Sequence, residues 1–413
     1  MGGPPTHLCA GLDVGATKVA LLVAAREPDG VVRYVEAAYI EARGLRDGVV
    51  VDLASVTEAV EQAIYLVEER LGRRLPPLCL AVSGRHLQSQ NLRGEVTITP
   101  LGREITAEDV TRAIAEARGG LRLGENRELL HEIPRAYMVD NQVGVQDPRG
   151  MAGRSLDVEV HYVSAAATTL QNLLKCVRQG RGQPELVVAA PLAAAEAVRD
   201  LHPDAQCLAV ADIGADITSF SIAIAGSVWL SDVIAEGGNA LTRELAAQFK
   251  VPGVTAEELK LRHGHCDPSH VEECALIELA DTDGVAEVVP RAEVARVLQQ
   301  RAYRFADLLA ERLEEARELG VEPEALVLTG GGAALPGLDT LLAHGLDLPV
   351  YRAGPSGIAG LPAVFAAPAF STAAGLVLWQ ARYAPGGGVA ARKKRPLSGF
   401  RAGLRRAFHT VLP

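Results

Sequence analysis

Two segments about two hundred residues apart share one pattern of strand, Asp-x-Gly turn and strand. The first covers residues 8–23 around Asp13 and Gly15, and the second covers residues 207–224 around Asp212 and Gly214. In each segment, runs of apolar residues on both sides of a tight turn predict a β-hairpin. One Asp-x-Gly turn is common and constrains little. Two such hairpins, each opening one half of the chain, predict a duplicated α/β fold.

Both turns have the composition of phosphate-binding loops. Glycine lets backbone N–H groups approach phosphate oxygens, and Lys18 at the end of the first turn can neutralise their charge. Asp13 can hold a hydrated Mg²⁺ through water molecules. The two hairpins therefore predict a site for a phosphate-bearing ligand.

A third segment, residues 325–337, is an apolar strand followed by Gly330, Gly331 and Gly332 and then by a helix pattern. Three glycines would let a flat nucleoside lie against the backbone, although a plain strand-to-helix turn of an α/β domain explains the segment equally well. In the order hairpin, hairpin, glycine-rich loop, the three segments resemble the duplicated nucleotide clamp of the actin, Hsp70 and sugar-kinase superfamily.

The last residues, 396–413, favour contact with a membrane surface. Apolar side chains recur at helical spacing, and arginines occupy the rim, so one face is apolar and the other cationic. Residues 384–413 carry seven positive charges and no acidic residue, whereas the whole chain carries −10, so the remainder carries −17. This segment is too short and too charged to span a bilayer, and we expect it to bind anionic lipid. The membrane-binding residues are Leu397, Phe400, Arg401, Leu404, Arg405, Phe408 and Val411.

Other interpretations of this tail and of the histidine-rich segment are weaker. A basic, disordered tail could touch nucleic acid or nothing, but such tails have no reason to space Leu and Phe at a helical period. We therefore expect no nucleic-acid partner. The run His263 to Cys266, with His270 and Cys274 after it, fits no standard zinc spacing, and we expect no zinc there. Six cysteines without a CxxC pair, and a start without a signal peptide, favour a reducing cytosol.

Several landmarks along the chain match the pattern of the FtsA family of bacterial division proteins. Each is modest alone, but their order is specific. They are residues 11–19, 81–86, 104–110, 130–140, 147–153, 156–161, 236–242, 260–264, 328–332 and 368–376.

The resemblance implies an α/β, actin/Hsp70-like duplicated nucleotide-binding fold with an inserted α+β subdomain and a C-terminal amphipathic helix. Strand patterns at residues 93–99 and 157–163 flank a helix pattern at 107–117, as an α+β insert requires. We expect residues 1–83 and 163–206 to form the first domain, and residues 84–162 to form the insert within it. The second domain is expected at residues 207–383, with its own insert at 241–302. A linker at 384–395 and a membrane helix at 396–413 would follow.

The resemblance also implies that ATP and Mg²⁺ bind between the two halves, with Asp13 and Asp212 holding the metal through water. The expected nucleotide-binding residues are Asp13, Gly15, Ala16, Thr17, Lys18, Asp212, Gly214, Ala215, Asp216, Thr218, Gly237, Gly238, Asn239, Lys260, Gly330, Gly331 and Gly332.

The partners that the family implies are division proteins and further copies of the chain. An FtsA-like protein polymerises head to tail, binds the C-terminal tail of FtsZ, recruits later division proteins, and lies on the cytoplasmic side of the membrane at the division septum. The expected docking residues for the FtsZ tail are Arg291, Arg296, Arg301 and Tyr303. Any one of these arginines could instead pair with an acidic neighbour on a solvated helix.

The second hairpin departs from the family pattern and leaves ATP hydrolysis open. Many members carry Gly-Gly-Thr-Thr-Asp where this chain has residues 215–219, and Asp216 places a carboxylate near the phosphate unless it turns outward or meets Mg²⁺. No residue is identified as the base that would orient the attacking water, so we expect an ATPase that is slow at most. Two alternatives remain: a sugar or metabolite kinase, and an actin-like scaffold for another machine such as pilus assembly.

Overall fold

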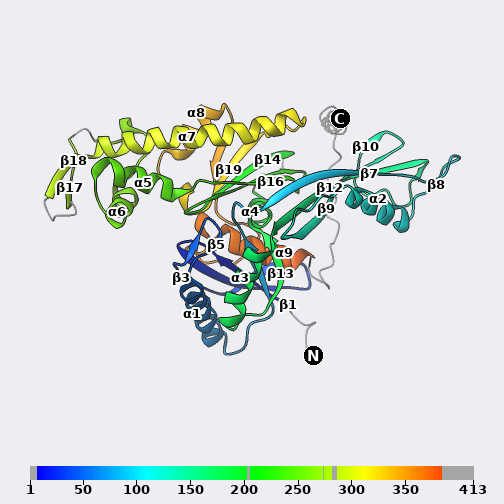
Figure 1. Ribbon diagram of the computed structural model, residues 1–413, viewed down its shortest axis with the longest axis horizontal. Coiled ribbons are helices and arrows are strands. Elements are labelled where there is room, and N and C mark those ends of the chain that lie inside the picture. Colours follow the sequence, from blue (N-terminus) through cyan, green and yellow to red (C-terminus); the bar gives the residue numbers. More distant parts are fainter. Residues whose placement is uncertain (1–6, 202–204, 273, 281–285, 384–413) are drawn as a thin grey trace.

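Two α/β halves and an elongated insert make up the molecule, and the glycine-rich and hairpin segments lie where the halves meet (Figure 1). The computed structural model describes residues 7–201, 205–272, 274–280 and 286–383. The predicted linker at 384–395 and the predicted membrane helix at 396–413 lie outside the described residues. No described helix is both long enough and apolar enough to cross a membrane.

The first half is built on a six-stranded mixed sheet in the order β13-β6-β1-β2-β3-β21. The first hairpin forms as the sequence predicts, because β1 pairs antiparallel with β2 from Val14↔Val19 outward. The strands are β1 (His7–Val14), β2 (Lys18–Arg26), β3 (Val32–Glu41), β6 (Leu78–Val82), β13 (Pro184–Ala189) and β21 (Ile358–Ala359). Strands β1, β6 and β13 are parallel, so their carboxyl ends share one edge of the sheet.

The second half repeats this plan in a sheet of order β16-β15-β14-β19-β20. Again an antiparallel hairpin and a third antiparallel strand continue into two parallel strands. The strands are β14 (Cys207–Ile213), β15 (Thr218–Ile224), β16 (Ser227–Ile234), β19 (Ala325–Thr329) and β20 (Val350–Arg352). The same strand order and directions in both halves confirm the predicted duplication.

Two helices pass between the sheets and pack directly on each other. Every residue of α4 (Ala190–Val198) is buried, and α9 (Ser371–Tyr383) is nearly so. A Cβ at Gly375 would lie 1.8 Å from the carbonyl oxygen of Ala193, so only glycine permits this approach. Helices α1 (Leu53–Leu71) and α3 (Ala167–Gln179) pack beside the first sheet and share its apolar core.

Helices and a small hairpin extend the second half. They are α5 (Gly238–Phe249), α6 (Gly253–His263), α7 (Arg291–Glu318), α8 (Leu338–Leu346), β17 (Leu276–Ala280), β18 (Ala286–Pro290), and the short 3₁₀ turns Pro268–His270, Gly331–Ala334 and Pro368–Phe370. The long helix α7 runs along the outside of this half (Figure 1). Its apolar stripe, which includes Leu298, Phe305 and Leu309, is buried in the core of the second half.

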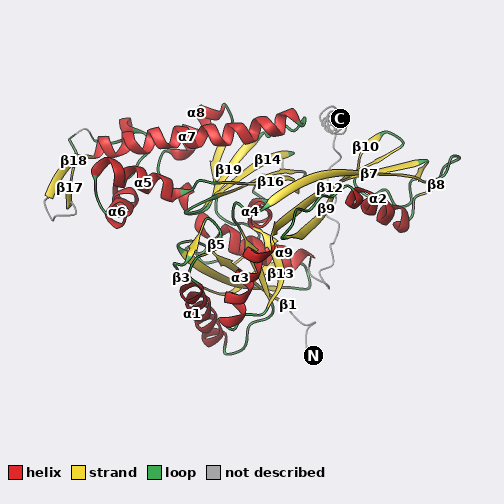
Figure 2. Ribbon diagram, in the orientation of Figure 1, coloured by secondary structure: helices red, strands yellow, loops and turns green. Residues whose placement is uncertain are grey.

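The insert is an α+β unit, as the sequence predicts, and it projects from the body (Figure 2). Its sheet has the order β10-β9-β12-β7, and one helix packs on it. The elements are β7 (Gln88–Thr97), β8 (Arg103–Glu104), α2 (Ala107–Gly119), β9 (Arg127–Val139), β10 (Gln142–Val145), β11 (Ala152–Gly153) and β12 (Ser155–Ala166). Thr106 caps α2 in a reciprocal capping box with Asp109, which explains where the helix begins.

Candidate functional site

The two phosphate-type turns bring three charged side chains together between the halves. Asp13 and Asp212 each lie one residue before the end of their strands, β1 and β14, and Lys18 begins β2. Burial raises the pKa of Asp13 to about 6, with the Lys18 ammonium opposing the rise and the Asp212 carboxylate adding to it. Burial also raises the pKa of Asp212, against the Thr372 hydroxyl and Lys18. Two half-buried carboxylates that share one nearby ammonium form a site suited to a hydrated cation.

The two turns close in the same way. The Gly15 N–H donates to the Lys18 carbonyl at 2.8 Å, and the Gly214 N–H donates to the Ile217 carbonyl at 2.9 Å. These bonds use the N–H groups of both glycines. Donors for a phosphate are therefore expected from the residues between, Ala16 and Thr17 in the first turn and Ala215 in the second.

The glycine-rich loop packs closely against strand β14, which the sequence did not reveal. A Cβ at Gly330 would lie 2.3 Å from Asp212 Oδ1, and one at Gly332 would lie 2.4 Å from Ile213 Cγ2. At Gly331 the nearest atom, Ala369 Cβ, would be 3.9 Å away, an ordinary van der Waals distance, so this position has room for a Cβ. Gly237 is equally constrained, since its Cβ would lie 2.6 Å from the Gly214 carbonyl oxygen. Close packing alone therefore requires glycine at Gly237, Gly330 and Gly332, whereas it does not require glycine at Gly331.

Lys260 and Thr218 are held by contacts within the second half. The Lys260 ammonium donates to the Gly238 carbonyl at 3.1 Å and to Thr242 Oγ1 at 2.8 Å, and it pairs with Glu257 at 2.7 Å. Lys260 thereby fixes the first turn of α5. The buried Thr218 hydroxyl donates to the Glu236 carbonyl at 2.7 Å, which ties the second hairpin to the same turn.

The Asp216 carboxylate bridges the two halves. Its two carboxylate oxygens accept hydrogen bonds from Asn239 Nδ2 at 2.8 Å and from the Asp47 backbone N–H at 3.2 Å. The carboxylate is thus satisfied by donors from both halves. The sequence left open whether Asp216 turns outward or meets Mg²⁺, and in the structure its oxygens are bound by these two protein donors.

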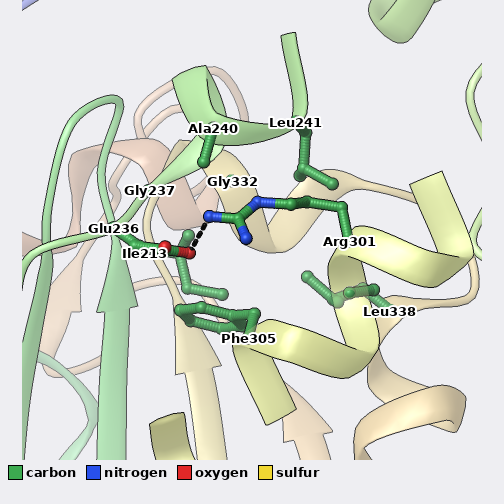
Figure 3. A pocket seen from close by; sticks show the side chains of 10 residues that line it. Ile213, Glu236, Gly237, Ala240, Leu241, Arg301, Phe305, Gly332 and Leu338 are labelled. Atoms are coloured by element: carbon green, nitrogen blue, oxygen red, sulfur yellow. Dashed lines mark ion pairs between the residues drawn. The ribbon is translucent and has the colours of Figure 1, made fainter. Parts of the chain in front are cut away.

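A small, largely apolar pocket lies between α5, α7 and the glycine-rich loop (Figure 3). Ile213, Leu241, Phe305 and Leu338 contribute its apolar walls, and Gly237 and Gly332 its backbone. Arg301 reaches into this pocket from α7 and forms an ion pair with Glu236. Glu236 was not among the predicted site residues, although its place directly before Gly237 was a signal that could have found it.

Comparison with known proteins identifies the family. The model for the SHS2 domain inserted in FtsA matches residues 84–164, and the model for cell division protein FtsA matches residues 209–375. FtsA of Neisseria meningitidis serogroup B is 30% identical over 373 residues, which cover 89% of this chain and 88% of that protein. The chain belongs to the FtsA family of cell division proteins. FtsA of Escherichia coli strain K12 is also 30% identical, over 90% of this chain and 89% of its own length.

Solved structures agree on the fold of this FtsA-family chain. The PilM-PilN type IV pilus biogenesis complex matches with a TM-score of 0.66 at 20% identity, over 91% of this chain and 98% of that chain. MreB 5 of Spiroplasma citri bound to AMPPNP matches with a TM-score of 0.51 at 16% identity, over 91% and 97% of the two chains. These likenesses establish an actin-like fold, and the family model at residues 84–164 establishes the inserted subdomain.

The four residues expected to bind the FtsZ tail fall into different environments. Arg296 and Tyr303 are exposed on α7, the latter by 51%. Arg291 Nε donates to the His263 carbonyl at 3.0 Å, which fixes the start of α7. The Arg301 side chain is only 14% exposed and faces the pocket with Glu236. Two of the four expected residues, Arg296 and Tyr303, are therefore on the open surface.

The histidine-rich segment of this FtsA-family chain is organised around Asp267. His265 Nδ1 accepts from the Asp267 N–H at 2.9 Å, and the Asp267 carboxylate pairs with His270 at 2.7 Å. Cys266 is fully buried, and Cys274 is exposed. Within the described ranges, no three His, Cys, Asp or Glu residues form a group that could hold a metal ion.

Helix α4 begins where a water-orienting side chain would be useful. It follows β13, whose carboxyl end lies at the same sheet edge as the Asp13 turn. Its first four residues are Ala190, Pro191, Leu192 and Ala193, and none has a polar side chain. This helix start therefore offers no group to orient a hydrolytic water.

Proposed function

We propose that this FtsA-family protein binds ATP with Mg²⁺ between its halves, assembles with copies of itself, and attaches FtsZ filaments to the cytoplasmic face of the membrane at the division septum. Family membership over about 90% of the chain is the observation that carries the proposal. The convergence of Asp13, Asp212 and Lys18 from the two halves supports the nucleotide site.

In the proposed complex, Lys18 and the turn residues Ala16, Thr17 and Ala215 contact the phosphates. Asp13 and Asp212 hold Mg²⁺ through water, and the ion offsets phosphate charge. Gly15 and Gly214 shape the two turns at the phosphates. The residues proposed to approach the ribose and base are Gly237, Gly238, Asn239, Gly330, Gly331 and Gly332. Asp216, Thr218 and Lys260 hold the backbone around the site. MreB 5, which has a similar fold, is bound to AMPPNP, and this supports nucleotide binding by the present chain.

ATP serves mainly as a structural or switching ligand in this proposal. The start of α4 offers no polar side chain that could activate water, and the Asp216 carboxylate is bound by Asn239 and by the Asp47 N–H. Phosphoryl transfer to water depends on such positioning, so turnover is slow or absent.

The exposed part of α7 is the proposed docking surface for the acidic and apolar FtsZ tail. Arg296 supplies charge, and Tyr303 supplies apolar area with a polar end. Arg291 orients the start of the helix, and Arg301 acts from the pocket behind it. The insert is the proposed contact for neighbouring subunits in a head-to-tail filament and for later division proteins.

Residues 396–413 are the proposed membrane foot. Leu397, Phe400, Leu404, Phe408 and Val411 enter the lipid interface, and Arg401 and Arg405 contact anionic headgroups. The negative charge of the remaining chain holds the body away from the same surface.

Sedimentation with liposomes tests the proposal. The full chain and a truncation ending at Tyr383 are mixed with anionic or neutral vesicles, with ATP, with and without FtsZ. The full chain should pellet with anionic vesicles and bring FtsZ down with it, and the truncation should stay in the supernatant with the same FtsZ. If the full chain stays in the supernatant, or pellets without FtsZ, the anchoring role is wrong.

A further inference from the structure

Three polar contacts join the halves beside the second phosphate-type turn. The Asp47 N–H donates to Asp216 Oδ2 at 3.2 Å. The hydroxyl oxygens of Ser83 and Ser219 lie 3.5 Å apart, and Arg85 Nη2 donates to the Ala235 carbonyl at 3.3 Å. Two of these contacts include a charged group, the Arg85 guanidinium and the Asp216 carboxylate, and hydrogen bonds of this kind are about twice as strong as neutral ones.

The same carboxylate also holds the turn that begins α5. Asp216 Oδ1 accepts from Asn239 Nδ2 at 2.8 Å, while the Asn239 N–H donates to the Ala215 carbonyl at 2.7 Å. The Gly238 N–H donates to the Gly214 carbonyl at 2.9 Å. The turn at residues 237–239 is therefore folded onto the second phosphate-type turn, and Asp216 links both to the first half.

The donor on the first half belongs to a rigid turn. Asp47 and Gly48, between β4 (Leu45–Arg46) and β5 (Val49–Val50), have φ angles of 51° and 79°. A Cβ at Gly48 would lie 2.0 Å from the Ser83 carbonyl oxygen, so the turn is pressed against the strand end that carries Ser83. The Ala42 N–H upstream donates to the Thr17 carbonyl at 2.9 Å. The turn is thus connected to the first phosphate-type turn as well.

A second, buried connection holds the halves together through the insert. Arg135 on β9 donates to the Trp229 carbonyl of β16, and its guanidinium lies 4.1 Å from the centre of the Trp229 ring. His161 on β12 hydrogen-bonds to Ser231 Oγ at 2.8 Å. Because these groups are buried and paired, separating them costs more than separating the part-buried contacts at Asp216.

We propose that Asp216 is a positioning residue that latches the nucleotide cleft closed. It joins Asp47 of the first half to Asn239 of the second, and thereby keeps both phosphate-type turns around the ligand. It touches neither phosphate nor base. The inference rests on the proposed nucleotide binding, and it predicts that losing the latch speeds nucleotide release far more than it slows association.

The latch itself can be tested without nucleotide. Hydrogen-deuterium exchange resolved to single amides is measured for the Asp47 N–H in the full chain and in D216A, D216N and D307A. D216A should exchange at least tenfold faster, and D216N should be intermediate because its amide oxygen still accepts one bond. D307A removes an exposed carboxylate from α7 and should match the wild type. An Asp47 exchange rate in folded D216A within twofold of the wild-type rate would overturn the latch.

The effect on the cleft is then measured as release of a fluorescent ATP analogue into excess ATP. Release from D216A should be about tenfold faster than from the wild type, D216N should again be intermediate, and association rates should agree within threefold. Equal release rates, or a slowed association with unchanged release, overturn the positioning role. If the wild type binds no analogue while its Asp47 exchange responds to D216A, the latch stands and the ATP proposal fails.

Discussion

At the residue scale, Gly330 combines a requirement of packing with a proposed role at the nucleotide. Gly330 has a φ angle of 84°, a conformation that a residue with a Cβ adopts only at a cost. A side chain there would also press on the Asp212 carboxylate and on the Ile213 backbone, with a closest approach of 2.3 Å. The residue that forms the proposed nucleotide wall is therefore required by the fold even without a ligand.

We expect Gly330→Ala to lower the free energy of unfolding by about 2–4 kcal/mol, since it combines a left-handed φ with a backbone clash. Urea denaturation measures the change. Gly331→Ala is the matched control, because its Cβ would meet nothing closer than 3.9 Å, and it should cost less than about 1 kcal/mol. Equal losses in the two variants would mean that the clash at Gly330 is relieved by movement of the loop.

Lys18 is the residue through which the proposed binding of ATP can be tested. Removing its ammonium should weaken ATP binding about 10- to 100-fold, because a charge-assisted contact to phosphate contributes roughly 1.5–3 kcal/mol. Titration of a fluorescent ATP analogue into Lys18→Ala measures the affinity. Lys175→Ala removes an exposed ammonium from α3 and should bind like the wild type. An unchanged affinity in Lys18→Ala would place the phosphates elsewhere.

At the element scale, strands of the insert are joined to a strand of the second half. Arg135 of β9 forms a buried ion pair with Glu159 of β12 and donates to the Trp229 carbonyl of β16. Ala136 and Met138 of β9 lie in the apolar core of the second half. The insert, although it interrupts the first half in sequence, is therefore packed against the second.

His161 makes this junction sensitive to acid. Burial, helped by the nearby Arg135 charge, lowers the pKa of His161 to about 3, whereas an unfolded histidine titrates near pH ~6.5. Below that pH the unfolded chain binds a proton that the folded chain rejects, so stability falls as pH drops from about 6.5 towards 3.

We expect the wild type to lose about 2 kcal/mol more unfolding free energy than His161→Gln between pH 7 and pH 5, from the linkage of one proton. Urea denaturation of both proteins at the two pH values gives the difference, and equal m-values would show that the same transition is compared. Identical losses in both proteins would show that His161 is protonated in the folded state.

At the scale of the whole molecule, charge is divided between the body and the tail. Seven cations lie in residues 384–413, while the rest of the chain sums to −17. If residues 396–413 form the proposed amphipathic helix, the apolar stripe gives membrane affinity and the arginines restrict it to anionic lipid. The effect of a substitution on membrane binding then depends on its position on the helix as well as on its charge.

We expect Phe408→Glu to lower binding to anionic vesicles at least tenfold, because it places a carboxylate on the apolar stripe. His409→Glu adds the same charge one residue away, off the stripe, and should weaken binding several-fold less. Flotation with vesicles measures both, and ATP binding by the body should be unchanged in each. Equal losses of vesicle binding in the two variants would mean that net charge alone drives contact with the membrane.

Local sequence patterns were sufficient to predict several secondary-structure elements of this protein. The hairpins around Asp13 and Asp212, the strand before Gly330, and the helix predicted at 107–117 each depend on a period or turn within about fifteen residues. The structure contains all four, with the helix as α2 at Ala107–Gly119. The duplication followed from two copies of one such pattern. The family followed from the order of the landmarks.

Contacts between distant residues were decided only by the tertiary structure. The Asp216 carboxylate accepts from the N–H of Asp47, which lies 169 residues earlier in the chain and across the cleft. Arg301 faces a pocket because Glu236 lies opposite on another element, and a local charge pattern on α7 does not contain that partner. The sequence determines which residues can carry charge and where strands turn. Packing of the two halves decides which charges meet, because that depends on the approach of surfaces that are distant along the chain.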